Sequence, residues 1–521
     1  MLMQRFLGAL SVLLLALHVM CGTAFADDDD TTYADDAETC ATAEGDERID
    51  ACTRVLAWAY ASRAMEYRKK DDKDRAFADY DEAIKLYRAI AHKAKEDDDR
   101  NDEARRTDPQ DYRAYIDRGL AHLAEGDNNS AIADFDQGIR LNPKDPVVFI
   151  NRGGAYRAKG EYDRAIYDYS EAIRLDPNYA QAYNDRGIAY RAKGEYDRAI
   201  ADYDEAIRLN PEDAPLYTNR AIAYRFKGDN DRAIADSDQA IRLDPKYAQA
   251  YNNRGLAYRA KGDYDRAIAD YDEAIRLDPK SALTYANRGD SYRAKGDHDR
   301  AIVDYDAAIQ LDPKGATAYN NRGLAYRFKG DNDRAIADYD AAIRLNPKSA
   351  VAYTNRGDSY RFKGDHDRAI ADYDAAIRLD PKGTVAYNNR GLAHSAKGDI
   401  DGAIADYDAA IRLNPKAAVS YNNRGMAYRA KGDNDRAIAD CDTAIQLDPL
   451  YTAAFTNRGL AYEKKGDREH ARADFNAALA LPQKYDNGKW AHETARARLA
   501  VLADTSATTT PAVSVPSPSE R

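Results

Sequence analysis

Two polar side chains recur at a fixed spacing along most of the chain, and their chemistry suits binding rather than catalysis. The first is asparagine, whose carboxamide offers a donor and an acceptor and can satisfy a peptide unit without reading its side chain. It stands at Asn151, Asn219, Asn253, Asn287, Asn321, Asn355, Asn389, Asn423 and Asn457. The second is arginine, a cation that attracts acidic ligands. It stands at Arg157, Arg191, Arg225, Arg259, Arg293, Arg327, Arg361 and Arg429.

Catalytic chemistry finds no support in the sequence. Apart from His18, His122 and His394 replace a core tyrosine of other repeats, while His298 and His366 stand at a turn between helices. No Ser-His-Asp, metal-ligand or phosphate-loop pattern accompanies them. The sequence therefore predicts a protein that is not an enzyme and that has no metal site and no cofactor.

One repeating unit must position these side chains. From residue 112 to 485 the chain is a single unit written eleven times without an insertion, for example AQAYNNRGLAYRAKGDYDRAIADYDEAIRLDPKS at 248–281. Such a period indicates helix-turn-helix units that stack because none can bury its apolar face alone. Alternate units share NNRGLAYR or NRGDSYR, so the duplicated block is often a pair of units. The Gly262-Asp263 pair is expected to end one helix and cap the next. With 32% charged residues, the chain suits a thin core of this kind.

The unit resembles the tetratricopeptide repeat, and particularly exported tetratricopeptide proteins of Gram-negative bacteria. We number its positions as places 1 to 34. The residues that carry the resemblance in 248–281 are Tyr251, Gly255, Tyr258, Ala267, Tyr271, Ala274 and Pro279. One departure is the seventh place, usually Leu in the family, which is Arg in all eleven units from Arg118 to Arg458. The resemblance implies an all-α superhelix, that is, a tetratricopeptide solenoid.

A helical wheel sorts the first helix of each unit into two sides. Places 4, 8 and 11 form the core stripe, whereas places 2, 5, 6, 9, 12 and 13 lie opposite. The resemblance implies that this second side lines a concave groove. The asparagines occupy place 6, and the ladder is similar to that of O-linked N-acetylglucosamine transferase, which holds an extended peptide by its backbone. A plain solvated face is the alternative. A dicarboxylate clamp is not expected, because its Lys at place 5 and Asn at place 9 are missing.

The two arginine positions have different expected partners. Arg at place 7 lies beside the core stripe, so we expect it to pair with acids of the second helix, as Arg254 would with Asp270 and Asp272. Arg at place 12 has two open interpretations. It pairs with acids of the next unit, or it makes the groove basic.

The N-terminus predicts export. Residues 1–26 have a basic start, an apolar stretch and the Ala24-Phe25-Ala26 cleavage pattern, so we expect a signal peptide and a periplasmic or secreted protein. An uncleaved anchor is the alternative, although the apolar run is short for a span of about 20 residues. No other segment is expected to cross a membrane. Residues 27–56 form an acidic arm with a short cysteine-containing helix, and binding of nucleic acid is not expected from this charge distribution.

The cysteines separate into a close pair and a single residue. Cys40 and Cys52 favour a local disulfide in an oxidising compartment, with two free thiols as the alternative. A metal site is poorly supported there, because two thiolates are too few for zinc and no histidine is near. Cys441 stands where most units have Tyr or Phe, so it is expected to be a small core residue.

The ends of the array are expected to differ from its middle. Residues 57–111 are a degenerate unit whose second helix is extended, and 486–503 are an amphipathic capping helix. The tail, 504–521, is rich in Ser, Thr and Pro and is expected to be disordered.

Two functions are compatible with this organisation. The first is a scaffold that binds other proteins or peptides, as extended segments, in an Asn-lined groove. The second is a structural accessory or spacer in a cell-envelope assembly or a polysaccharide export machine, which an exposed apolar patch at either cap would favour.

Overall fold

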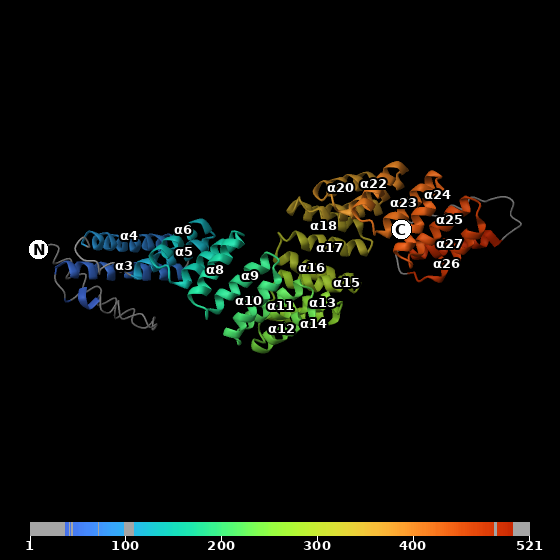
Figure 1. Cartoon of the computed structure of the whole chain (residues 1–521). Helices are drawn as coiled ribbons and strands as arrows, with labels where there is room; N and C mark the ends of the chain where they lie inside the picture. The colour runs from blue at the N-terminus through green and yellow to red at the C-terminus, as the bar shows by residue number, and fades with distance from the viewer. Residues whose placement is uncertain are drawn as a thin grey trace. The chain divides into compact units, whose positions relative to one another are not determined.

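The computed structural model describes residues 37–40, 42, 45–70, 72–97, 109–483 and 487–503, and all regular secondary structure in these residues is helical (Figure 1). The predicted signal peptide, most of the acidic arm and the predicted tail lie outside them. None of the described helices is long and apolar enough to cross a membrane. The chain divides into two compact units, 1–257 and 258–521, which are described separately.

Unit 1 contains ten helices of the described chain and most of an eleventh. They are α3 (Gly45–Lys69), α4 (Lys73–Asp97), α5 (Pro109–Glu125), α6 (Asn128–Leu141), α7 (Pro146–Ala158), α8 (Tyr162–Leu175), α9 (Ala180–Ala192), α10 (Tyr196–Leu209), α11 (Ala214–Phe226), α12 (Asn230–Leu243) and α13 (Ala248–Ala260).

Unit 2 continues with the same alternation. Its helices are α14 (Tyr264–Leu277), α15 (Ala282–Ala294), α16 (His298–Leu311), α17 (Ala316–Phe328), α18 (Asn332–Leu345), α19 (Ala350–Phe362), α20 (His366–Leu379), α21 (Thr384–Ala396), α22 (Ile400–Leu413), α23 (Ala418–Lys431), α24 (Asn434–Leu447), α25 (Thr452–Lys464), α26 (Arg468–Ala480) and α27 (Gly488–Ala503). Within each unit consecutive helices pack as pairs, so the protein is an all-α solenoid of stacked hairpins.

The turn between the two helices of a repeat follows the predicted Gly-Asp pair. After α17, Gly330 has a φ of 82°, which favours glycine, and its N–H donates to the carbonyl of Arg327 at 2.9 Å. The Asp331 side chain then caps α18 by accepting from the N–H of Arg334 at 3.1 Å. The prediction of an ended helix followed by a capped one is confirmed.

The core of most repeats contains an aromatic ring at place 24 packed on a glycine at place 8, while the repeat at 418–451 places Cys441 against Gly425. Tyr407 is almost fully buried, and a Cβ added to Gly391 would lie 2.7 Å from its Cε1. Only a residue without a side chain leaves room for the ring. One repeat is an exception on both sides of this contact, because Ala221 at place 8 faces Ser237 at place 24.

The arginine at place 7 joins two repeats instead of one. Nε and Nη2 of Arg288 donate to the buried carboxylate of Asp304 in its own repeat at 2.9 and 2.6 Å, and Nη1 donates to Asp272 of the preceding repeat at 2.6 Å. The expected pairing with place 23 is therefore present, whereas Asp272 at place 25 binds the arginine of the following repeat, which the sequence did not indicate. Stacking brings that aspartate closer to the next arginine. The hydrogen bonds to the buried carboxylate of Asp304, with a smaller contribution from the exposed carboxylate of Asp272, raise the pKa of Arg288.

Arg254 also binds the place 25 aspartate of the preceding repeat, since its Nη1 donates to Asp238 at 2.6 Å. The degenerate unit also carries this clamp, with Arg63 bound to Asp79 at 2.6 and 2.8 Å. A buried carboxylate left without its arginine would cost about 3–5 kcal/mol. The clamp therefore holds both the two helices of a repeat and neighbouring repeats together.

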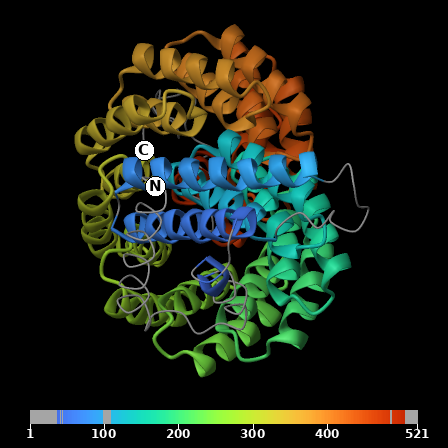
Figure 2. The ribbon, with the colours of Figure 1, turned by 90° about the vertical axis from the view of Figure 1, so that its left-hand side faces the viewer.

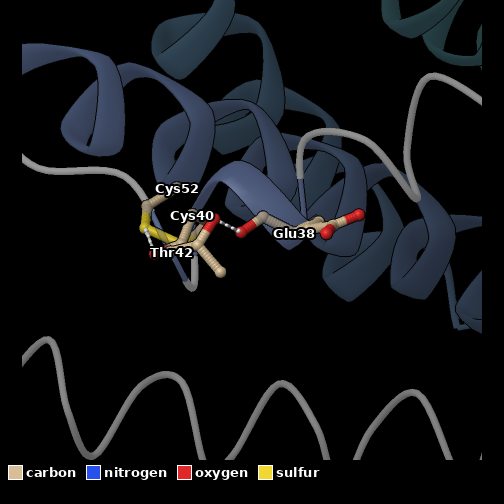
Figure 3. Close-up of a disulfide and its surroundings, with 4 residues drawn as sticks. All are labelled: Glu38, Cys40, Thr42 and Cys52. Carbon is tan, nitrogen blue, oxygen red and sulfur yellow. Dashed lines mark hydrogen bonds between the residues drawn. A yellow bond between two sulfur atoms is a disulfide. The ribbon is translucent and has the colours of Figure 1, made fainter.

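The N-terminal end contains the predicted degenerate hairpin, α3 and α4, which lie side by side (Figure 2). α3 runs without a break through the boundary expected between residues 56 and 57, because no Gly or Pro interrupts it after Gly45. In the structure Cys40 and Cys52 form a disulfide with Cα atoms 4.7 Å apart, next to a bond from the Thr42 hydroxyl to the Glu38 carbonyl (Figure 3). The extended second helix is described to Asp97.

The C-terminal end is covered by α27, close to the predicted capping helix. Trp490, Ala491 and Ala495 are buried against the last repeat. Place 12 of that repeat is Glu463 rather than Arg, and both of its carboxylate oxygens accept from Arg498 of α27. The reversed charge at this place fits the last repeat to its cap.

Candidate binding surface on the first helices

The first helix of each repeat turns one side away from its core stripe. Places 2, 9 and 13 lie within about 40° of one another on a helical wheel. In unit 2, the first helices α15, α17, α19, α21, α23 and α25 contact one another in this order. Their outward sides therefore form one continuous surface, which we call the first-helix face. In unit 1, α5, α7, α9 and α11 are related in the same way.

The asparagines of place 6 lie along the edge of the first-helix face and are partly or wholly covered. The buried ones are Asn253, Asn287, Asn423 and Asn457, and the half-buried ones are Asn151, Asn219, Asn321, Asn355 and Asn389. Stacking of the repeats therefore leaves this edge only partly open to solvent.

Most of these carboxamides belong to hydrogen-bond chains that run between repeats. Asn423 Nδ2 donates to Asn388 Oδ1 at 3.1 Å, Asn388 to Asn389 at 3.2 Å, and Asn389 to the Asp358 carboxylate at 2.9 Å. The chain begins two bonds earlier, where Asn457 donates to Asn422 at 2.9 Å and Asn422 to Asn423 at 3.3 Å. A carboxylate only accepts, so Asp358 fixes the orientation of every amide in the chain.

A shorter chain of the same kind ends at a second aspartate. Asn355 donates to Asn320 at 3.0 Å, Asn320 to Asn321 at 3.1 Å, and Asn321 to Asp290 at 3.0 Å. In unit 1, Asn219 donates to Asn184 at 2.9 Å. In all of these bonds the donor at place 6 finds its acceptor on the preceding repeat.

The acceptor alternates between two places. In two repeats the acceptor is an aspartate at place 9, Asp290 or Asp358, and place 5 is Ala or Thr. In the repeats that follow these two, place 9 is Leu and the acceptor is an asparagine at place 5, Asn320 or Asn388. The repeat at 214–247 has neither, and accordingly Asn253 Nδ2, on the next repeat, is buried without a hydrogen-bond partner among the described residues. The pattern agrees with a duplicated block of two repeats, because the place 9 aspartates, Asp290 and Asp358, stand in alternate repeats.

Asp290 shows how one carboxylate does this. It accepts from Arg259 Nη1 of the preceding repeat at 2.7 Å, from the Tyr305 hydroxyl of its own repeat at 2.7 Å, and from Asn321 of the following repeat. Burial and this carboxylate raise the pKa of Tyr305. Arg327 lies 3.7 Å from Asp358 in the equivalent contact. For these arginines of place 12, pairing with the next repeat is confirmed.

Other arginines of place 12 have no such aspartate within reach, because the next repeat has an apolar residue at place 9. Arg293 approaches Asp290 of its own repeat at 3.7 Å. Arg191 lies beside the hydroxyl of Tyr203, whose burial raises its pKa to about 12. Arg361 lies over the ring of Phe362 at 4.5 Å, and Arg225 over Phe226 at 4.6 Å. The structure thus divides one sequence stripe into two classes of arginine.

Sequence reasoning missed the apolar residues of the first-helix face. Place 2 is Val or Leu in five repeats, and place 13 is Phe in three; all are exposed. They are Val147, Leu283, Val351, Val385, Val419, Phe226, Phe328 and Phe362. The signal was present, since places 2, 9 and 13 share one side of the helix and repeatedly carry aliphatic or aromatic residues. The sequence instead predicts a binding surface made of the asparagines of place 6 and the arginines of place 12.

Histidine, acidic and cysteine side chains of the described residues show no second candidate site for a metal ion or a reactive thiol. Those residues contain no cluster of three or more His, Cys, Asp or Glu that could hold a metal ion. His394 Nδ1 lies 2.8 Å from Asp399, at the cap of α22. Cys441 is fully buried in the core, which raises its pKa and keeps the thiol unreactive.

Comparison with known proteins agrees with this architecture. Models described as tetratricopeptide repeat or TPR repeat match along the array. The matched segments are 59–90, 112–145, 153–190, 180–213, 202–235, 223–259, 248–281, 270–303, 289–327, 316–349, 354–418, 418–451 and 452–485. The chain belongs to the tetratricopeptide repeat family. Proteins of this family generally bind other proteins or peptides, and the chain is a protein-protein interaction scaffold.

Solved structures of several repeat proteins are similar to parts of the chain. MamA is 34% identical, with 32% of this chain and 96% of that chain covered and a TM-score of 0.30. A tetratricopeptide repeat protein from Parabacteroides merdae is 22% identical, covering 48% and 98%, with a TM-score of 0.41. Yeast Tom70 is 18% identical, covering 75% and 97%, with a TM-score of 0.39. No curated protein matches the chain.

Proposed function

We propose that this scaffold is a non-enzymatic, exported protein that holds extended segments of other proteins along its first-helix face. The observation that carries the proposal is the continuity of that face from α15 to α25, together with the exposed apolar side chains that it carries at places 2 and 13. Export and a periplasmic or secreted location rest on the signal-peptide pattern of residues 1–26.

The asparagines of place 6 contribute hydrogen bonds to the bound segment only through the donors and acceptors that their bonds within the array leave unused. A carboxamide has two N–H donors and two acceptor sites. Asn389, for example, uses one donor on Asp358 and one lone pair on Asn388, which leaves one of each for a bound backbone. We assign this role to the half-buried members, Asn151, Asn219, Asn321, Asn355 and Asn389, rather than to the buried ones.

The spacer alternative has less support. It was expected to show an exposed apolar patch at a cap, but in the C-terminal capping helix the exposed large hydrophobic residue is Val501 alone. The larger apolar surface lies along the first helices.

Site-specific photocrosslinking in intact cells tests the proposal. A photoreactive amino acid at Val385, exposed on the first-helix face, is expected to capture other proteins. The same group at Val303, equally exposed on the second helix α16, is the control and is expected to capture little. Equal capture from both positions, or no capture from Val385, would contradict binding along the first-helix face.

A further inference from the structure

Three exposed valines of unit 2 stand at the same place on three consecutive first helices. Val351 on α19, Val385 on α21 and Val419 on α23 all stand at place 2 and are 62%, 60% and 47% exposed. Place 9 adds the half-buried Leu392 and Met426 two turns further along the same side of α21 and α23. Because α19 contacts α21 and α21 contacts α23, these residues form one apolar row across the repeats.

Two arginines flank this row without an internal carboxylate. Arg361 on α19 and Arg429 on α23 are half-buried, and neither forms an ion pair with any residue that the structure describes. The cause is the next repeat, where place 9 is Leu392 or Leu460 instead of the aspartate that Arg259 and Arg327 find. Burial without a carboxylate lowers the pKa of Arg429.

The array itself does not need this arrangement. Between the two arginines, the repeat at 384–417 has Ser395 at place 12 and still stacks in the same way. An apolar row at a regular spacing is unusual on a soluble surface and marks a contact with another molecule. A partner that offers aliphatic side chains to the row and carboxylates to its edge would satisfy both features.

We infer that the apolar row on α19, α21 and α23 binds an extended segment of another protein that carries aliphatic and acidic residues. Its aliphatic side chains lie on Val351, Val385 and Val419, and its carboxylates pair with Arg361 and Arg429. A second copy of this chain, joined through the same face, would cover the valines, but the aspartates at place 9 of that face, Asp290 and Asp358, are already bound within the array. The inference rests on the proposed function and specifies its partner.

Three labelled synthetic peptides of equal length test the inference by fluorescence anisotropy with the full chain. The first spreads valines and aspartates among serines and glycines, the second replaces aspartate by lysine, and the third replaces valine by serine. The first is expected to bind at least about tenfold more tightly than the others, which corresponds to about 1.4 kcal/mol.

Variants locate the site. Val351→Ser, Val385→Ser and Val419→Ser together are expected to weaken binding of the first peptide about tenfold, because apolar contact is lost. Arg361→Ser with Arg429→Ser, which copies the natural Ser395, is expected to remove the preference for aspartate over lysine. Val303→Ser, an equally exposed change on α16, is the matched control and is expected to have no effect. Circular dichroism checks that all variants remain folded.

The outcomes separate this inference from the proposed function. Equal binding of the three peptides would mean that only the backbone is read, which overturns the inference and leaves the proposed function standing. Preference for the lysine peptide, or unchanged binding by the valine variant, would also overturn it. Failure of all three peptides to bind would overturn both.

Discussion

Replacing Asn355 by alanine should destabilise the array, whereas the same change at Asn253 should not. Both residues occupy place 6 and are shielded from solvent, but only one is satisfied. Asn355 Nδ2 donates to Asn320 Oδ1 at 3.0 Å, while Asn253 Nδ2 is buried without a partner among the described residues. The two variants delete the same atoms from equivalent positions, so each is the control for the other.

The expected sizes follow from the hydrogen-bond inventory. Asn355→Ala removes a bond with a net value of about 0.5–1.5 kcal/mol and leaves Asn320 Oδ1 without its donor, so a loss of about 1–3 kcal/mol is expected. Asn253→Ala removes an N–H donor that loses its hydrogen bonds to water on folding and gains no hydrogen bond in the protein. Its effect on the free energy of unfolding is therefore expected to be about zero or slightly stabilising.

Urea unfolding followed by circular dichroism measures the global change, and hydrogen exchange of α17 and α19 locates it, because repeat arrays open in segments. A double variant with Asn320→Ala should lose less than the sum of the two single changes, since the two side chains contact each other. If Asn253→Ala proved as destabilising as Asn355→Ala, the inter-repeat hydrogen-bond chain would not be what these asparagines contribute.

Three further outcomes are expected. Ser237→Tyr should cost about 1–3 kcal/mol by overpacking against Ala221; urea unfolding should show that adding Ala221→Gly relieves the cost, and no relief would contradict the place 8 to place 24 contact. The N-cap hydrogen bonds lower the pKa of Asp331, so its contribution is present above the ordinary value of about 4 and is lost as pH falls through the lowered one; the urea midpoint of Asp331→Asn should therefore trail the parent at pH 7 and approach it in acid, and a constant gap would refute this. Peptide mapping after alkylation without reductant should find Cys40 and Cys52 joined, and labelling of both thiols would rule the disulfide out.

The sequence alone determined the repeat, the turn between the two helices of a repeat and the core positions within one repeat. A strict repeat period without insertions leaves few architectures, and the Gly-Asp turn and the ring at place 24 act over short distances that a single unit already contains. The pairing of Arg288 with Asp304 was predictable for the same reason, because both lie in one hairpin.

Only the tertiary structure decided what happens between repeats. In the structure Asp272 binds the arginine of the next repeat. The place 6 asparagines form hydrogen-bond chains that end at Asp290 and Asp358. Arg361 and Arg429 have no carboxylate partner among the described residues. A helical wheel gives the direction of a side chain but not its distance from the neighbouring repeat. The stacking distance determines which of two equivalent acids is reached and which polar groups remain available to a partner.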